Sequence, residues 1–204
     1  MQSTLFDVAA EPTFGDAADA VRTDLGRGAW IDWRPNWLTG ADGVFDHLMT
    51  EVDWQSGERQ MYDSVVTVPR LTRTYGPQDR WPHPVLREAC AELSRAYRPE
   101  LPEGFATAGL CLYRHQQDSV AWHGDRIGRA RNADTLVAIV SLGASRVLAL
   151  RPRGGGEAIR LELAHGDLLV MGGSCQRTFD HCVPKQRTPV GPRISIQYRP
   201  IGVW

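Results

Sequence analysis

The feature that most constrains the fold is a series of short β-type runs in the second half of the chain. From residue 105 onward, β-branched and apolar residues cluster in runs separated by glycine turns such as Gly143-Ala144 and Gly154-Gly155-Gly156. The predicted strands cover residues 107–114, 119–123, 135–142, 145–151, 157–163, 167–171 and 193–199. Many short strands at this spacing indicate a sandwich or barrel. We therefore expect an α+β protein, mainly β, with an antiparallel double sheet after N-terminal helices.

The first 100 residues have a more helical pattern. Apolar residues recur at helical spacing over 43–52 and again from Pro84 to Arg98, where the proline suits the first turn of a helix. A shorter helix is predicted over Asp16 to Leu25. Residues 61–69 are typical of a strand ended by proline, and residues 69–82 are typical of a loop. No repeat or linker divides the chain.

Composition limits the class of protein. The 204 residues carry a net charge of −1, so no global basic field indicates nucleic-acid binding. No apolar run approaches the ~18 residues of a membrane span, and the N-terminus lacks the pattern of a signal peptide. We therefore expect a cytoplasmic protein that does not enter a membrane.

The four cysteines form no C-x-x-C pair and show no zinc spacing. They are Cys90, Cys111, Cys175 and Cys182. In the cytoplasm we expect reduced thiols, which fill the core except where Cys111 has a further role.

The tripeptide His-Gly-Asp occurs twice, at His123–Asp125 and at His165–Asp167. Two histidines and one carboxylate on one face are the ligand set of non-heme Fe(II) oxygenases, and His-x-Asp at a strand end places two ligands on one side. The third ligand would be His181, which is separated from Asp125 by 55 residues and from His165 by 15. The spacing favours the first tripeptide, while the second fits a tight turn with Asp167 bonded to local backbone. An isolated His-x-Asp can also be accidental.

One face of the predicted strand 193–199 is polar. Arg193, Ser195, Gln197 and Arg199 alternate with apolar residues and therefore share that face. Two arginines facing inward are costly without an anion, and a dicarboxylate such as 2-oxoglutarate would pair with them. The alternative is a strand face in solvent. Tyr113 is a further candidate donor.

Taken together, these residues resemble the AlkB family of Fe(II)- and 2-oxoglutarate-dependent dioxygenases that dealkylate nucleic acids. The segments that carry the resemblance are VPRLTRTYG at 68–76, LYR at 112–114, DSVAWHGD at 118–125, GDLLVM at 166–171, HCVP at 181–184 and RISIQYR at 193–199. They follow the expected order from about residue 60 onward. The resemblance selects His123, Asp125 and His181 as the iron ligands.

The resemblance implies a double-stranded β-helix, or jelly roll. Residues 1–204 would form one domain, with about 1–100 as an N-terminal extension, nucleotide-recognition lid and supporting helices, and about 105–204 as the core. Arg193 would bind the distal carboxylate of 2-oxoglutarate. The other implied cosubstrate contacts are Tyr113, Arg199, Cys111 and Ser195.

The resemblance also suggests substrate contacts. Tyr75 would stack on a flipped base, with Arg73 nearby, while Trp122 would either line the site or belong to the core. Arg126, with Arg129 and Arg131, would reach phosphates or lie in a solvated loop.

This sequence departs from the family pattern at three places. Cys111 and Ser195 stand where asparagine is common, and Arg126-Ile127 stands where acidic residues often read the base. The first two changes affect cosubstrate contacts, and the third weakens any transfer of base specificity.

The expected function is oxidative demethylation of N-alkylated bases, such as 1-methyladenine and 3-methylcytosine, in DNA and possibly RNA. Fe(II), 2-oxoglutarate and O2 would be required, with succinate, CO2 and formaldehyde as products, and the protein would act as a monomer. One alternative keeps the chemistry but acts on a small molecule, a tRNA base or a protein side chain. Another is a binding module that recognises modified nucleic acid without turnover.

Overall fold

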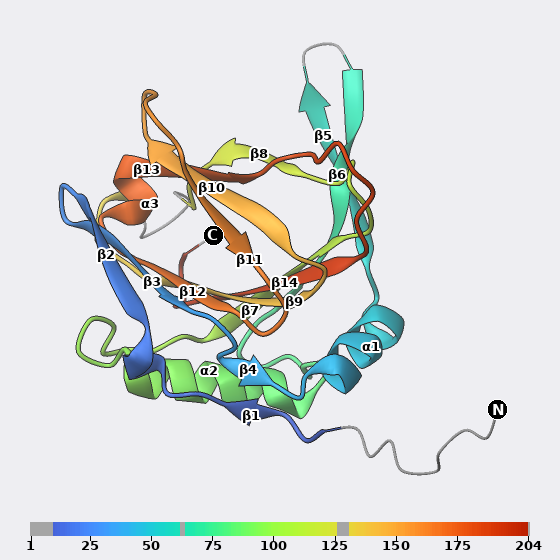
Figure 1. The fold of residues 1–204 in the computed structure, drawn as a ribbon, viewed down its shortest axis with the longest axis horizontal. Coiled ribbons are helices and arrows are strands. Elements are labelled where there is room, and N and C mark those ends of the chain that lie inside the picture. Colours follow the sequence, from blue (N-terminus) through green and yellow to red (C-terminus); the bar gives the residue numbers. More distant parts are fainter. Residues whose placement is uncertain (1–9, 62–63, 126–130, 204) are drawn as a thin grey trace.

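The computed structural model describes residues 10–61, 64–125 and 131–203. Its second half is a pair of antiparallel sheets (Figure 1). The strands are β7 (Thr107–Tyr113), β8 (Val120–His123), β9 (Val137–Gly143), β10 (Arg146–Pro152), β11 (Ile159–Leu163), β12 (Leu168–Gly173), β13 (Phe179–Val183) and β14 (Arg193–Arg199). A short helix, α3 (Cys175–Thr178), connects β12 to β13.

The winding of these strands confirms the predicted jelly roll. The large sheet contains the order β12-β9-β14-β7, and the small sheet has the order β11-β10-β13-β8. The chain therefore crosses between the two sheets repeatedly, as a double-stranded β-helix does. Strand 179–183, which the sequence analysis missed, is needed to complete the small sheet.

The N-terminal part extends the large sheet and covers one of its faces. Its elements are β1 (Thr13–Phe14), a 3-10 helix (Ala17–Asp19), β2 (Val21–Gly26), β3 (Ala29–Arg34), β4 (Leu38–Thr39), α1 (Asp42–Glu51), β5 (Gln55–Met61), β6 (Ser64–Tyr75) and α2 (Pro84–Ala96). The large sheet has eight strands in the order β2-β3-β12-β9-β14-β7-β6-β5. Both of its ends are thus built from residues before position 100. The predicted division near residue 105 falls between α2 and β7, and the one-domain organisation stays a prediction.

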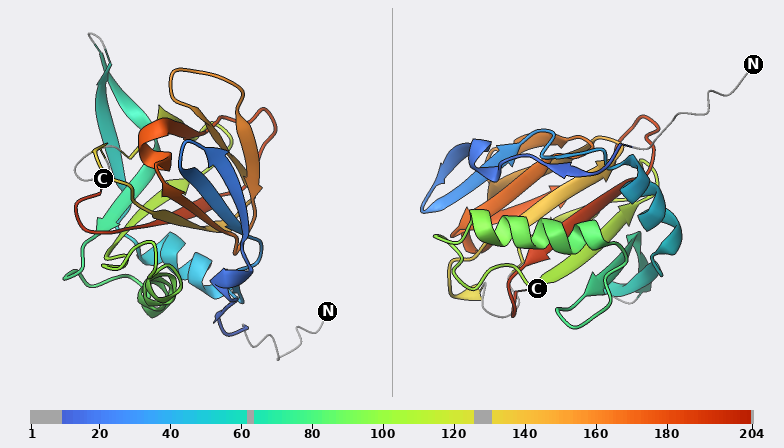
Figure 2. Two further views of the ribbon diagram at one scale, coloured as in Figure 1. Left: turned by 90° about the vertical axis from the view of Figure 1, so that its left-hand side faces the viewer. Right: turned by 90° about the horizontal axis from the view of Figure 1, so that it is seen from below.

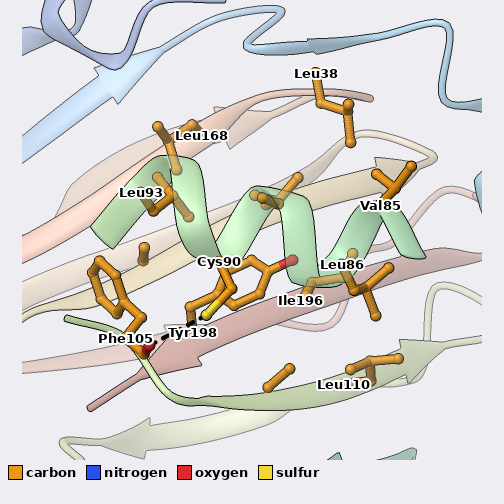
Figure 3. Close-up of a cluster of buried hydrophobic side chains, with 14 of the residues drawn as sticks. Leu38, Val85, Leu86, Cys90, Leu93, Phe105, Leu110, Leu168, Ile196 and Tyr198 are labelled. Carbon is orange, nitrogen blue, oxygen red and sulfur yellow. Dashed lines mark hydrogen bonds between the residues drawn. The ribbon is translucent and has the colours of Figure 1, made fainter. Parts of the chain in front are cut away.

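Two hydrophobic cores lie on opposite faces of the large sheet. One is between α1, α2 and the sheet, where Leu93 and Ile196 are almost fully buried (Figures 2 and 3). The other lies between the two sheets and joins Ile139 and Met171 to Leu150 of the small sheet. Each buried leucine or isoleucine contributes about 1.5–3 kcal/mol relative to exposure. A central strand such as β9 is buried on both faces, which explains why its sequence is apolar except for Ser141.

Two of the four cysteines, Cys90 and Cys175, belong to these cores. All four are free and buried. Cys90 of α2 donates a hydrogen bond to the Phe105 carbonyl oxygen, at 3.4 Å (Figure 3), and burial raises the pKa of its thiol to about 11.

The predicted helix over Asp16–Leu25 is wrong. Only a single 3-10 turn forms there, and the chain then enters β2, which pairs with β3 as a hairpin. The turn places Gly26, Arg27 and Gly28 at positive φ, which glycine adopts at little cost. The bidentate pair between Arg22 and Asp32 across the hairpin, at 2.7 and 2.8 Å, stabilises the strands further.

The predicted end of a strand at Pro69 is also wrong, because β6 continues to Tyr75. The pairing of β5 with β6 is irregular between Ser56 and Glu58, opposite the segment that contains Pro69. A proline lacks an N–H donor, and a bulge is where a strand tolerates that loss. The Pro69 carbonyl still accepts a hydrogen bond from the Ser119 N–H, at 2.7 Å.

The β5–β6 hairpin stands away from the body of the protein beside the small sheet (Figure 1).

The predictions for helices at 43–52 and at Pro84–Arg98 are confirmed by α1 and α2, with Pro84 in the first turn of α2. In the part of the chain that the structure describes, no helix is long and apolar enough to cross a membrane.

Candidate metal and cosubstrate site

Two histidines meet across neighbouring strands of the small sheet. His123 ends β8 and is the direct partner of His181 on β13, with ring centroids 4.3 Å apart. Asp125 follows two residues after His123, and its Oδ1 lies 3.9 Å from His123 Nε2. One ligand atom from each of the three residues lies within 4.8 Å of the others. The structure therefore brings together the three residues predicted as iron ligands.

The surroundings of the two histidines favour metal binding, through the ring orientation of His123 and the burial of His181. His123 Nδ1 lies 2.8 Å from the Ala121 carbonyl oxygen. A carbonyl only accepts, so Nδ1 carries the proton and Nε2 keeps a free lone pair. Burial, followed by the proximity of His123, lowers the pKa of His181 to about 3. His181 is thus unprotonated at neutral pH.

Asp125 is fixed from two directions. Arg199 Nε donates to Asp125 Oδ2 at 2.8 Å, and Arg199 Nη2 forms an ion pair with the same oxygen at 2.7 Å. The Asp125 N–H donates to Gln176 Oε1 at 3.0 Å. Burial alone would raise the pKa of Asp125, but Arg199 and the two histidines outweigh it, so that this pKa is lowered. The carboxylate stays charged, with Oδ1 left on the side of the histidines. Residues that orient a ligand in this way tune the affinity of a metal site.

A cavity of about 320 Å³ adjoins the triad between the two sheets. It is lined by Arg70, Cys111, Tyr113, Val120, His123, Gly124, Asp125, Ile139, Leu148, His181, Val183, Ser195, Gln197 and Arg199. Two histidines and one carboxylate beside an open space fit Fe(II), which needs free coordination positions for its cosubstrates.

Arg193 is not among the residues that line the cavity, but it shares a face of β14 with Ser195, which lines it. Among the described residues, it is a buried cation without an anion. It is 1% exposed, and its Nε donates to Ser141 Oγ at 2.8 Å. Neither Nη1 nor Nη2 has a partner among the described residues, and burial lowers its pKa. Such a group is costly unless an anion pairs with it, and a carboxylate would take both amino groups at once.

The remaining predicted cosubstrate residues lie together around the cavity. Tyr113 has its ring 5.5 Å from the Arg193 guanidinium carbon and is almost fully buried, which raises the pKa of its phenol. Cys111 and Ser195 are direct cross-strand partners, and both line the cavity. Arg199 lines it too, but its Nε and one amino group are committed to Asp125.

The predicted substrate residues Tyr75 and Arg73 lie elsewhere. They pair with Ala108 and Leu110, whose side chains belong to the core under the helices. Since cross-strand partners share a face, Tyr75 and Arg73 point away from the cavity. Tyr75 is 8% exposed within that core, so its ring is not placed to stack on a base.

The residue of β6 that does line the cavity is Arg70, which the sequence analysis missed because it assigned this segment to a loop. Trp122 lies under the Arg151 guanidinium, 4.1 Å from carbon to ring centroid, and is not among the residues that line the cavity. Arg126, like Ile127 and Arg129, lies outside the described residues. Arg131 is exposed.

The second His-Gly-Asp tripeptide forms a turn, as predicted. His165 Nδ1 accepts a hydrogen bond from the Gly143 N–H, at 3.0 Å. Asp167 accepts from the Asn36 N–H at 2.9 Å and from the Ala164 N–H at 3.0 Å. Its carboxylate is therefore used by backbone and not by a metal.

Comparison with known proteins agrees with this geometry. Residues 31–199 match the 2OG-Fe(II) oxygenase superfamily. The alpha-ketoglutarate-dependent dioxygenase alkB homolog 3 of Bos taurus is 31% identical over 188 residues, which cover 80% of this chain and 63% of that protein. The DNA oxidative demethylase ALKBH2 of Bos taurus is 26% identical and covers 79% of this chain and 64% of its own length.

Two solved structures share the fold. A 2OG-Fe(II) oxygenase family oxidoreductase from Burkholderia pseudomallei has a TM-score of 0.59 at 11% identity and covers 85% of this chain and 86% of its own. The structure of OsALKBH1 has a TM-score of 0.56 at 15% identity and covers 87% of this chain and 100% of its own.

The chain spans about 63% of the length of the first curated relatives it matches. The match nevertheless includes the three ligands, the cavity and the arginine strand β14. The chain therefore belongs to the 2OG-Fe(II) oxygenase superfamily and, within it, to the AlkB family.

Proposed function

We propose that this protein is an Fe(II)- and 2-oxoglutarate-dependent dioxygenase that removes alkyl groups from N-alkylated bases in DNA or RNA. The proposal rests on two features found together: the His123–Asp125–His181 triad, and a buried Arg193 whose two amino groups have no hydrogen-bond partner among the residues that the structure describes. The names of the AlkB-type relatives support nucleic acid as the substrate class. Substrates such as 1-methyladenine and 3-methylcytosine belong to this proposal, as do the monomeric state and the cytoplasmic location.

The residues of the site would have separate roles in binding the metal and the cosubstrate. His123, Asp125 and His181 would hold Fe(II), and Arg193 would bind the distal carboxylate of 2-oxoglutarate by bidentate hydrogen bonds. When bound, the metal and its cosubstrates supply the oxidation, in which 2-oxoglutarate and O2 become succinate and CO2 while an N-linked methyl is hydroxylated and then lost as formaldehyde. Arg199 keeps Asp125 charged and aimed at the metal position.

The walls of the cavity would orient the bound cosubstrate and substrate and exclude water. Ile139, Leu148 and Val183 line it with apolar surface, which limits unproductive access of solvent to the metal. The β5–β6 hairpin, which projects beside the small sheet (Figure 1), is the candidate nucleotide-recognition lid.

A second candidate keeps the chemistry and changes the substrate to a small molecule, a tRNA base or a protein side chain. The orientation of Tyr75 and Arg73 away from the cavity supports this second candidate, because the ring expected to stack on a base is not in the site. The net charge of −1 points the same way.

The test incubates the protein with Fe(II), 2-oxoglutarate, ascorbate and oligonucleotides that carry 1-methyladenine or 3-methylcytosine. Mass spectrometry of the oligonucleotide, with succinate and formaldehyde measured in parallel, should show matched loss of the methyl group. His123→Ala should abolish all three signals, and His165→Ala is the matched control that should retain them. Succinate without demethylation on any DNA or RNA would favour the second candidate, and tight binding without succinate would leave only a binding module.

A further inference from the structure

Gln197 has a defined amide orientation on the cavity face of β14. Its side chain lines the cavity between Ser195 and Arg199. Its Oε1 accepts a hydrogen bond from Arg199 Nη2, at 2.8 Å. A guanidinium can only donate, so this contact places the amide oxygen toward Arg199 and the NH2 group on the opposite side.

The NH2 group of Gln197 has only weak acceptors. Nε2 lies 3.5 Å from Cys111 Sγ and 3.4 Å from Ser195 Oγ. Sulfur is a weak acceptor, and 3.4 Å is long beside the usual distance of about 2.9 Å. The amide therefore presents two N–H donors at the wall of the cavity, and no strong acceptor within residues 10–61, 64–125 and 131–203 binds them.

The strand opposite leaves room for this arrangement. Gly109 of β7 is the direct partner of Gln197. A Cβ at Gly109 would lie 3.0 Å from Arg199 Nη1 and 3.7 Å from Gln197 Oε1. The missing side chain thus makes space for the Arg199–Gln197 pair.

We propose that Gln197 is a cosubstrate-binding residue that donates its amide N–H to the 2-oxo-carboxylate end of 2-oxoglutarate. This inference rests on the proposed function. The contacts from Asp125 through Arg199 hold the amide oxygen on the metal side of the cavity. The NH2 group therefore lies beside Cys111 and Ser195, between the metal position and Arg193. Arg193 lies four residues earlier on the same face, about 13 Å along the strand. Arg193 binds the distal carboxylate of 2-oxoglutarate, and Gln197 binds its 2-oxo-carboxylate group, the end that would coordinate the metal.

The test compares two ligands that share one end. Pyruvate has the 2-oxo-carboxylate group but no distal carboxylate. Both ligands are titrated anaerobically into the Fe(II)-loaded protein, and chelation is followed by the visible charge-transfer absorption of a 2-oxo acid on Fe(II). Gln197→Glu keeps the acceptor for Arg199 and replaces the donor, so the Kd of both ligands should rise roughly 10-fold or more.

Two further variants sharpen the result. Gln197→Leu removes the amide without adding charge and should raise the Kd of both ligands by a similar factor. Arg193→Met should raise the Kd of 2-oxoglutarate and leave that of pyruvate unchanged. Fe(II) affinity, measured separately, distinguishes lost cosubstrate contacts from a disturbed Asp125.

Unchanged affinity for both ligands in the two Gln197 variants would overturn the inference, as would a loss confined to 2-oxoglutarate or to Fe(II). Failure of the unmodified protein to bind 2-oxoglutarate at all would instead overturn the proposed function, and the inference with it.

Discussion

The tripeptide His-Gly-Asp occurs twice in this chain and adopts two different structures. In the first, His123 and Asp125 face a cavity at the end of β8, and His181 lies directly across the strand pair. In the second, His165 and Asp167 form a turn whose polar atoms bond to backbone N–H groups. The chemistry of the two copies is identical, so their different roles come from what surrounds them.

The environment of each copy explains why only the first can bind a metal. The first copy has a neighbouring strand that supplies another histidine. Arg199 orients the Asp125 carboxylate, and Gln176 accepts a hydrogen bond from the Asp125 backbone N–H. The second copy has Gly166 at φ +82°, packed against the Leu38 carbonyl, which reverses the chain tightly. A metal site therefore requires an open face and oriented partners as well as the correct ligands.

The largest expected contrast is in metal binding. His123→Ala removes a ligand and should lower Fe(II) affinity by more than the roughly 100-fold upper figure for losing a residue that only orients a ligand. His165→Ala should bind one Fe(II) per chain with unchanged affinity. Anaerobic equilibrium dialysis with metal analysis measures both, and equal losses in the two variants would remove the distinction between the copies.

The next contrast is in stability. Gly166→Ala forces a Cβ to within 2.1 Å of the Leu38 carbonyl oxygen at a positive φ, and we expect a loss of about 3 kcal/mol in the free energy of unfolding. Urea denaturation of the metal-free protein measures it. The folded fraction should keep its Fe(II) affinity, and a selective loss of that affinity would place the second copy in the metal site.

A smaller loss of stability is expected from Asp167→Asn. The carboxylate accepts two backbone hydrogen bonds, one from Asn36 and one from Ala164. An amide keeps only one accepting oxygen, so the free energy of unfolding should fall by about 1–3 kcal/mol. Thermal and urea unfolding test this, and a variant as stable as the original protein would show that the turn does not depend on the charge.

The smallest effect concerns the orientation of Asp125. Gln176 is 1% exposed and accepts the Asp125 N–H. Gln176→Met keeps the volume but removes the acceptor, and Fe(II) affinity should fall roughly 10-fold. Gln176→Glu, which keeps an acceptor, should retain more of the affinity. If both variants bound Fe(II) as tightly as the original protein, Gln176 would have no role in positioning the ligand.

The sequence predicted the features that depend on local pattern. The period of apolar residues identified α2 and most core strands, and alternation identified the polar face of β14 that carries Arg193 and Arg199. Residue type and spacing favoured the three metal ligands, and the ordered resemblance to the AlkB family selected them. These signals are local or follow the order of the chain, so they do not depend on tertiary packing.

Features set by long-range pairing could not be predicted in this way. No α-helix forms over Asp16–Leu25, because the segment enters β2, which pairs with β3. Strand β6 continues through Pro69, because a bulge accommodates the proline. The side of the sheet on which Tyr75 lies depends on the register of β6 against β7, because a shift of one residue reverses the faces. Gln176 likewise reaches Asp125 only through the tertiary fold, across 51 residues.

The central claim is that the first His-Gly-Asp copy, and not the second, holds the metal. Crystals grown anaerobically with Fe(II) and 2-oxoglutarate would test it directly by anomalous scattering at the iron absorption edge. We predict one peak, bounded by His123, Asp125 and His181, with 2-oxoglutarate extending toward Arg193. A peak at His165 and Asp167, or no peak at the triad in fully loaded protein, would contradict the account.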